Sequence, residues 1–163
     1  MNDAGNQESS IDVSKLQIIC AVLVLATVGW MAYVIFATDS LGADQAPVLG
    51  TWTIFGAAFA GIALLLKMFI GNMMELSAAN KPDEGEEDLP ANKEALIGVY
   101  KRQFIVSQFL LASAAFLNID ATFHEHYWAS LGVACIMVIA MVAGYPTSTA
   151  VERWVGKRMA RTA

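Results

Sequence analysis

Four long stretches of this sequence carry almost no charge. They comprise residues 16–36, 48–70, 103–123 and 127–145. Each is about 19 to 23 residues long, and a helix of about 20 residues rises 30 Å, the thickness of the hydrocarbon core of a bilayer. A segment inside lipid must satisfy its own backbone hydrogen bonds, so a span of this length has to be helical. The pattern predicts four transmembrane helices.

A soluble bundle of four buried helices is the alternative interpretation of the same pattern. Each helix of such a bundle would need a polar stripe that faces water, and none of the four stretches has one. Charged residues make up only 15% of the chain, against about a quarter in soluble domains. The sequence therefore predicts an all-α integral membrane protein. Residues 14–163 are expected to form one four-helix bundle, built from two transmembrane hairpins.

The ten Lys and Arg residues are predicted to lie on one side of the membrane. They are Lys15, Lys67, Lys81, Lys93, Lys101, Arg102, Arg153, Lys157, Arg158 and Arg161. The connection between the first two stretches and the connection between the last two contain no Lys or Arg. Because short loops rich in Lys and Arg stay in the cytoplasm, both termini are predicted to be cytoplasmic in a bacterial inner (plasma) membrane. Lys67 is expected to extend its ammonium group to the inner surface.

Two segments outside the stretches are predicted to be solvated. Residues 1–13 are small and polar, and we expect them to be disordered in the cytoplasm. Residues 76–92 contain five acidic residues between Asp83 and Asp88. Such a run repels itself, so this segment is predicted to be a solvated cytoplasmic linker.

Residues 149–160 are predicted to form a short amphipathic helix. Val151, Trp154, Val155 and Met159 fall on its apolar face, opposite the basic residues. A helix of this kind lies in the membrane surface, with its basic side chains near lipid phosphates. The residues expected to contact the lipid surface are Trp154, Arg153, Lys157, Arg158 and Arg161.

Both histidines of the chain lie in one short polar turn, FHEHYW, between the third and fourth stretches. Together with the preceding aspartate, the turn offers Asp120, His124, Glu125 and His126 as candidate metal ligands. Zinc takes three or four ligands of these types, although their spacing matches no established zinc motif. The alternative is a polar, acidic turn at the membrane surface, where aromatic neighbours favour the interface. We favour the polar turn, and the metal site stays open as the less favoured interpretation.

The stretches themselves offer little catalytic chemistry. No Asp or Glu lies near the middle of any stretch, although such residues mark most proton and ion pathways. A haem would need histidines inside the bundle, and both lie at one end. Cys20 and Cys135 differ in depth by about 12 Å, which is too far for a disulfide. The sequence predicts no cofactor, and nothing in it indicates a nucleic-acid partner.

Small and polar residues within the stretches are predicted to pack helices closely. The Gly56/Ala60 and Ala57/Gly61 pairs of the second stretch both have the small-xxx-small spacing. The predicted packing residues are Gly56, Ala60, Gly61, Gln108, Ser113, Ala140 and Gly144. Contacts within one bundle and contacts with other subunits would use such residues equally, so both remain open.

Three functions remain compatible with the sequence. The first is a small non-catalytic membrane protein, an accessory or structural subunit of a larger complex, whose partners are membrane lipids and other membrane subunits. The second is a small channel or carrier formed by a homo-oligomer, with Gln108, Ser113 and Asn118 along its path. The third and least favoured is a metal-dependent membrane enzyme that uses His124 and His126.

Overall fold

The computed structural model describes residues 13–37, 49–79 and 89–162, so the predicted N-terminal segment lies almost wholly outside the described residues. The elements are α1 (Ser14–Ala37), α2 (Thr51–Ala79), α3 (Leu89–Glu125), α4 (Trp128–Ala143) and α5 (Ser148–Thr162). Within these ranges there is no strand. The prediction of an all-α protein is confirmed.

Three of the helices are long and apolar enough to cross a membrane, namely α1, α2 and α3. Helix α4 has 16 residues and reaches the length of a span only when it is counted together with α5, from which it is bent by 78°. The helix in the predicted fourth stretch therefore ends at Ala143. The last residues of the stretch belong to the short connection between α4 and α5. Pro146 lies in that connection and lacks the N–H that a continuing helix would need.

Helices α2 and α3 both extend beyond the apolar stretches that predicted them. Helix α2 continues to Ala79 and α3 already begins at Leu89, so both ends of the predicted linker 76–92 are helical and residues 80–88 lie outside the described residues. Pro90 does not prevent this early start, because it falls in the first turn of α3, where its missing N–H would have no partner within the helix. Hydropathy marks the apolar part of a helix, not its ends.

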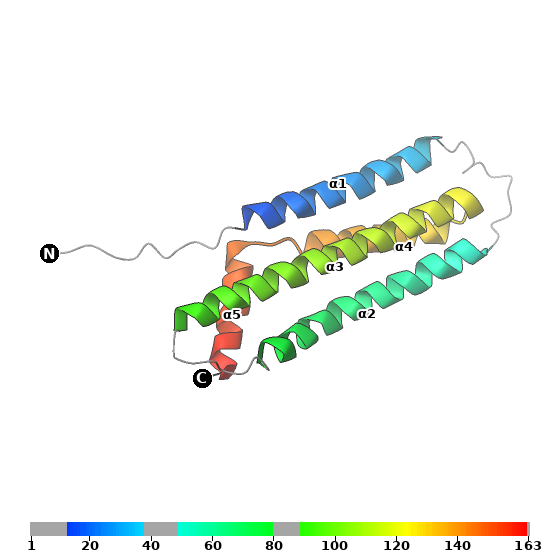
Figure 1. The fold of residues 1–163 in the computed structure, drawn as a ribbon. Helices are drawn as coiled ribbons and strands as arrows, with labels where there is room; N and C mark the ends of the chain where they lie inside the picture. The colour runs from blue at the N-terminus through cyan, green and yellow to red at the C-terminus, as the bar shows by residue number, and fades with distance from the viewer. Residues whose placement is uncertain (1–12, 38–48, 80–88, 163) are drawn as a thin grey trace.

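Helix α3 is the central helix of the fold. It contacts α1, α2, α4 and α5, and Figure 1 shows α1 and α2 on opposite sides of the pair α3 and α4. In the described part of the chain, α1 and α2 do not contact each other. The first of the two predicted hairpins is therefore not a packed one: its helices are neighbours in sequence only.

The interior between these helices is built mainly from small residues. Ala60 and Ala63 of α2 face Ala112, Ala114 and Ala115 of α3, and Leu111, Met137 and Met141 complete this core. Large apolar side chains point outward instead; Leu25, Phe36 and Phe55 are each about two-thirds or more exposed. A soluble monomer rarely exposes such extended apolar surface.

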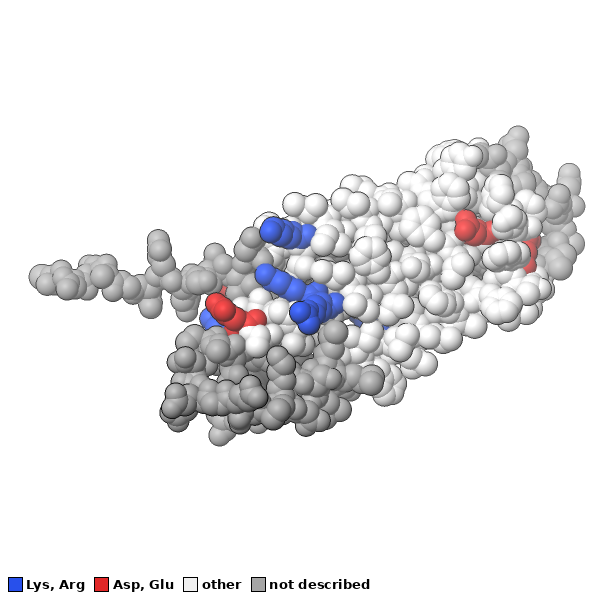
Figure 2. All heavy atoms as spheres, viewed as in Figure 1, with Lys and Arg blue, Asp and Glu red and all other residues white. Residues whose placement is uncertain are grey.

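Charge lies at the two ends of this apolar surface. On the face seen in Figure 2, Lys and Arg side chains gather toward the end at which α5 lies. We call this the α5 end, and we call the opposite end, where His126 and Tyr127 join α3 to α4, the turn end. At the turn end, the charged side chains visible on this face are all Asp or Glu.

The apolar face of α5 packs on protein. Val151 and Val155 are buried in a cluster with Val13 and with Leu96 and Ile97 of α3. The predicted lipid-facing apolar side of residues 149–160 is thus largely covered by the start of α3. An amphipathic pattern shows that one face is buried but does not show what buries it.

Both cysteines are free thiols, as predicted. The sulfur of Cys20 lies 3.9 Å from the carbonyl oxygen of Met141. The sulfur of Cys135 lies 3.8 Å from the sulfur of Met31. Each thiol therefore occupies its own place between α1 and α4.

Candidate functional site

The carboxylate of Glu125 caps the N-terminus of α2. It accepts hydrogen bonds from the backbone N–H groups of Trp52 at 2.6 Å and Thr53 at 2.8 Å. These donors belong to the first turn of α2, where backbone N–H groups lack partners within the helix and attract negative charge. Gly50 leaves room for the carboxylate, because a Cβ atom at this position would collide with it. Glu125 thereby ties the end of α3 to the start of α2.

The other three candidate metal ligands of the turn end have separate surroundings. Asp120 accepts a hydrogen bond from the indole of Trp30 at 3.1 Å, and the ring of His124 stacks on Trp52 with centroids 5.6 Å apart. His126 has a positive φ of 51°. Among the described residues, no three His, Cys, Asp or Glu side chains are grouped so that they could hold a metal ion. The structure therefore does not bring these four residues together as one site.

The two small-residue pairs of α2 face in different directions. Gly56 and Ala60 are buried against α3, and the side-chain nitrogen of Asn118 donates to the carbonyl of Gly56 at 2.9 Å. Ala57 and Gly61 are exposed, and a Cβ atom at Gly61 would meet nothing within 4 Å. One pair is used within the chain and the other is left on the surface.

The remaining predicted packing residues also divide. Ser113 is exposed on α3. Gln108 is buried and donates to the carbonyl of Met141 at 3.3 Å. The carbonyl of Ala140 accepts from the ammonium of Lys67, also at 3.3 Å, and Gly144 lies beside the amide of Gln108. Gln108, Ala140 and Gly144 thus meet around one feature near the α5 end.

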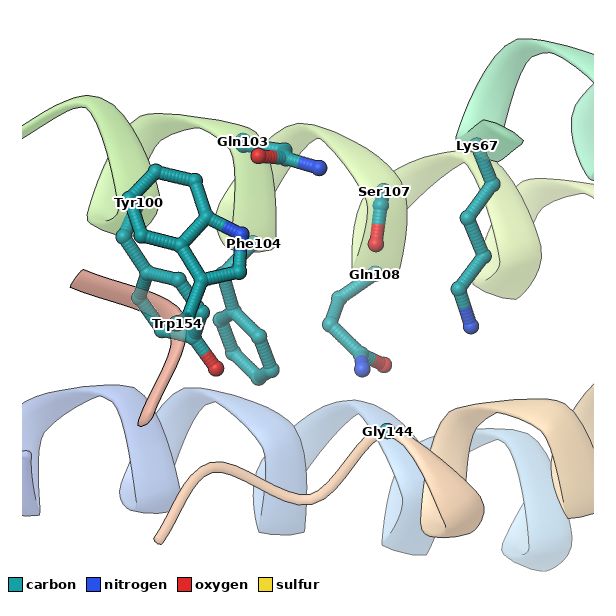
Figure 3. A pocket seen from close by; sticks show the side chains of 8 residues that line it. All are labelled: Lys67, Tyr100, Gln103, Phe104, Ser107, Gln108, Gly144 and Trp154. Atoms are coloured by element: carbon teal, nitrogen blue, oxygen red, sulfur yellow. The ribbon is translucent and has the colours of Figure 1, made fainter. Parts of the chain in front are cut away.

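That feature is a pocket of about 200 Å³ between four helices. Figure 3 shows the side chains that line it. They come from α2, α3, the end of α4, and α5, and are Lys67, Tyr100, Gln103, Phe104, Ser107, Gln108, Gly144 and Trp154. Of these residues, none is Asp or Glu. The pocket therefore combines a cation, amides and hydroxyls with three aromatic walls.

Two acceptors in the pocket have no hydrogen-bond partner within the described structure, the side-chain oxygens of Gln103 and Gln108. Gln108 is only 1% exposed. Its amide nitrogen is occupied by the carbonyl of Met141, which fixes the oxygen on the other side of the group. Buried acceptors are nearly always paired with protein or water, and both glutamines line the pocket, so a water or ligand held there can supply the missing donors.

Two of the five residues expected at the lipid surface lie on the outer side of α5. Arg153 and Lys157 are exposed. Trp154 is partly buried and meets Tyr100 edge-on, with ring centroids 5.3 Å apart. The side chains of Arg158 and Arg161 lie outside the described residues. The predicted surface residue Trp154 is thus also a wall of the pocket.

The pocket could not be read from any one stretch of sequence. Its only sequence signal is Lys67, the single Lys or Arg within the four stretches. The sequence places the ammonium group of Lys67 at the membrane surface only because the lysine side chain is long enough to reach it. In the structure, its ammonium reaches the carbonyl of Ala140 in a different helix, which is a contact that hydropathy does not encode.

Fold and pocket define a class and no more: an all-helical protein with three or four candidate membrane spans and a polar pocket at one end. The chain matches no protein-family model, no curated protein and no solved structure.

Proposed function

We propose that this protein is a non-catalytic, multi-pass membrane protein that serves as an accessory or structural subunit of a larger membrane complex. The observation that carries the proposal is the outward-facing pair Ala57 and Gly61 on α2. Small residues four apart allow two transmembrane helices to approach closely. The chain already uses the neighbouring pair, Gly56 and Ala60, for this purpose against its own α3.

The proposed arrangement is a four-helix bundle in a bacterial inner membrane with both termini in the cytoplasm. The outward-facing large apolar side chains of α1 and α2 support insertion into lipid. The basic residues gathered at the α5 end support a cytoplasmic position for that end. Helix α5 would then lie along the inner surface, with Arg153 and Lys157 toward lipid phosphates.

The proposed partner is a transmembrane helix of another subunit, packed along Ala57 and Gly61. Gly29 of α1 offers a useful contrast, because it too is exposed with nothing within 4 Å. Its neighbours four residues away are Leu25 and Tyr33, which are 70% and 56% exposed. Gly29 therefore has a large exposed side chain four residues away on each side, whereas Gly61 has Ala57 on one side and Leu65, which is 57% exposed, on the other. The small-residue strip of α2 is thus the single turn from Ala57 to Gly61, along which another backbone can lie.

The channel or carrier interpretation has less support. Its proposed path used Gln108, Ser113 and Asn118. Ser113 is exposed on α3, while Gln108 and Asn118 are buried, and the amide nitrogen of Asn118 is committed to Gly56 and Ala114. These three side chains do not line one passage. The metal-enzyme interpretation has no support from the placement of His124 and His126.

The test is purification of the tagged full chain from its native membrane in mild detergent, followed by native mass spectrometry. The wild type is expected to elute with other proteins in fixed ratio. The Gly61→Leu variant should lose them, because a large side chain would hold the partner helix away. The Gly29→Leu variant should retain them.

Two results would overturn the proposal. A wild-type particle that contains only this chain would exclude a role as a subunit of a larger complex. If that particle is a defined homo-oligomer, the channel or carrier interpretation would be favoured instead. Equal retention of partners by Gly61→Leu and Gly29→Leu would show that the α2 strip is not the contact surface.

A further inference from the structure

We propose that the pocket between α2, α3, α4 and α5 binds a phosphate ester that also carries hydroxyl or amine donors, the chemistry found in the polar head of a glycerophospholipid. The argument uses the groups that line the pocket. The choice of a lipid as the source rests additionally on the membrane insertion proposed above.

The first step is the positive charge of Lys67. Its ammonium group carries three N–H donors, and the structure shows one hydrogen bond, to the carbonyl of Ala140 at 3.3 Å. No Asp or Glu is among the described residues that line the pocket. A half-buried ammonium beside a pocket whose described lining holds no carboxylate favours an anionic ligand, and Lys is a common partner of phosphate.

The second step is the pair of unpaired acceptors. The side-chain oxygens of Gln103 and Gln108 are buried without a partner, so the ligand should donate hydrogen bonds as well as carry negative charge. A carboxylate, or a fully ionised inorganic anion such as sulfate or chloride, supplies no such donors. A phosphate ester that also carries a hydroxyl or amine group supplies both.

The third step is the size and lining of the pocket. Its volume of about 200 Å³ is far above the ~10–15 Å³ that one water needs. Tyr100, Phe104 and Trp154 form apolar walls on the α5 side (Figure 3), with Tyr100 and Phe104 stacked at 6.4 Å. These rings suit the carbon backbone of a head group, while Lys67 and the glutamines meet its polar atoms.

The fourth step is the depth of the pocket. Lys67 follows the first residue of α2 by 16 positions, or about 24 Å along the helix axis. The hydrocarbon core of a bilayer is about 30 Å thick. In the proposed orientation, the pocket thus lies close to the level of the inner-leaflet head groups, where Lys101 and Arg102 would add to the attraction for anionic lipid.

The experiment is lipid binding by the delipidated full chain in detergent, read by native mass spectrometry. Phosphatidylglycerol carries both phosphate and hydroxyl donors. Phosphatidylcholine carries phosphate without donors, and diacylglycerol carries a hydroxyl without phosphate. We expect phosphatidylglycerol to bind about tenfold or more tightly than either of the others, because each lacks one of the two interactions. Equal retention of all three lipids would overturn the proposal and leave a water-filled pocket.

Variants then assign the binding to the pocket. Lys67→Met should weaken phosphatidylglycerol binding about tenfold or more, and Lys67→Arg should largely retain it. Lys15→Met is the matched control, because Lys15 is an exposed lysine of α1 at the same end of the protein and does not line the pocket. Equal binding by the wild type and Lys67→Met would overturn the proposal.

Gln103→Leu keeps the test decisive if Lys67→Met fails to fold. The side-chain oxygen of Gln103 has no hydrogen bond to lose, so this variant is expected to remain folded. It should reduce the preference for phosphatidylglycerol over phosphatidylcholine, and an unchanged preference would count against the proposed donors.

A competing soluble ester identifies the source of the phosphate. If an excess of glycerol 3-phosphate displaces phosphatidylglycerol, the pocket accepts the head group alone and a soluble phosphate ester is a sufficient ligand. If it does not, acyl chains contribute and the ligand is a lipid. Both results support the phosphate site. The comparison of the three lipids and the comparison of the variants are the tests that can contradict it.

Discussion

The side-chain nitrogen of Asn118 donates a hydrogen bond to the carbonyl oxygen of Gly56 at 2.9 Å, and this bond joins α3 to α2 inside the core. The same nitrogen also donates to the carbonyl of Ala114 at 2.8 Å. The contact depends on glycine, because a Cβ atom at Gly56 would lie 2.9 Å from the side-chain oxygen of Asn118.

Gly56→Ala is therefore expected to destabilise the protein. The added methyl group would displace a buried amide and weaken both of its hydrogen bonds, at a cost of about 1–3 kcal/mol. The midpoint of thermal unfolding, followed by circular dichroism in detergent, should fall by about 2–4 °C per kcal/mol. Gly61→Ala is the control, because a Cβ atom there meets nothing within 4 Å. A Gly56→Ala midpoint equal to that of Gly61→Ala would contradict the proposed close approach.

Replacement of Glu125 should loosen the turn end. Glu125→Gln keeps an acceptor for the N–H groups of Trp52 and Thr53 but removes the charge that favours a helix N-terminus. Glu125→Leu removes both. The unfolding midpoint should fall in the order wild type, Gln, Leu, and the gap between wild type and Gln should narrow at high salt, which screens charge. Glu152→Gln, on an exposed part of α5, should have little effect.

The turn between α3 and α4 contains a residue in the left-handed region, His126, with φ of 51°. Left-handed backbone costs a non-glycine residue about 1–2 kcal/mol. His126→Gly should consequently be more stable than His126→Ala by about 1 kcal/mol, although both remove the same imidazole. Their unfolding midpoints, measured side by side, provide the test, and equal midpoints would mean that the turn relaxes without strain.

Chelation should leave stability unchanged. The carboxylate of Glu125 is held by backbone N–H groups of α2, and the ring of His124 is stacked on Trp52, so the turn is held by contacts that need no metal. A metal ion present at about 100 times its Kd would add about 2.7 kcal/mol. Treatment with a chelator would then lower the unfolding midpoint. A fall that added zinc reverses would restore the metal-site interpretation of FHEHYW.

The sequence predicted where the helices lie along the chain better than it predicted which helices pack against each other. Apolar length located α1, α2 and α3, because a span of about 20 uncharged residues has few other uses. It did not predict that α1 and α2 lie apart, since adjacency along the chain says nothing about which faces meet. It also could not assign Gly56 inward and Gly61 outward, because both belong to small-residue pairs with identical spacing.

The candidate sites show the same limit. The FHEHYW turn resembled a ligand cluster only because its residues are close in sequence; the actual partner of Glu125 is the start of α2, 72 and 73 residues earlier. The pocket shows the reverse case, in which residues far apart in the sequence meet in the structure. Lys67, Gln108 and Trp154 are far apart in sequence, and only the packing of four helices brings them to one cavity.

The central position of α3 also has a consequence for biosynthesis. Helices α1 and α2 are made first, yet in the described residues they share no contact. Glu125 is 46 residues beyond Ala79, and at about 5–20 residues per second the ribosome needs about 2 to 9 seconds to complete α3 after α2. During that interval neither early helix has its main partner, so we expect a chain that stops at Ala79 to leave two separate helices for cellular quality control to remove.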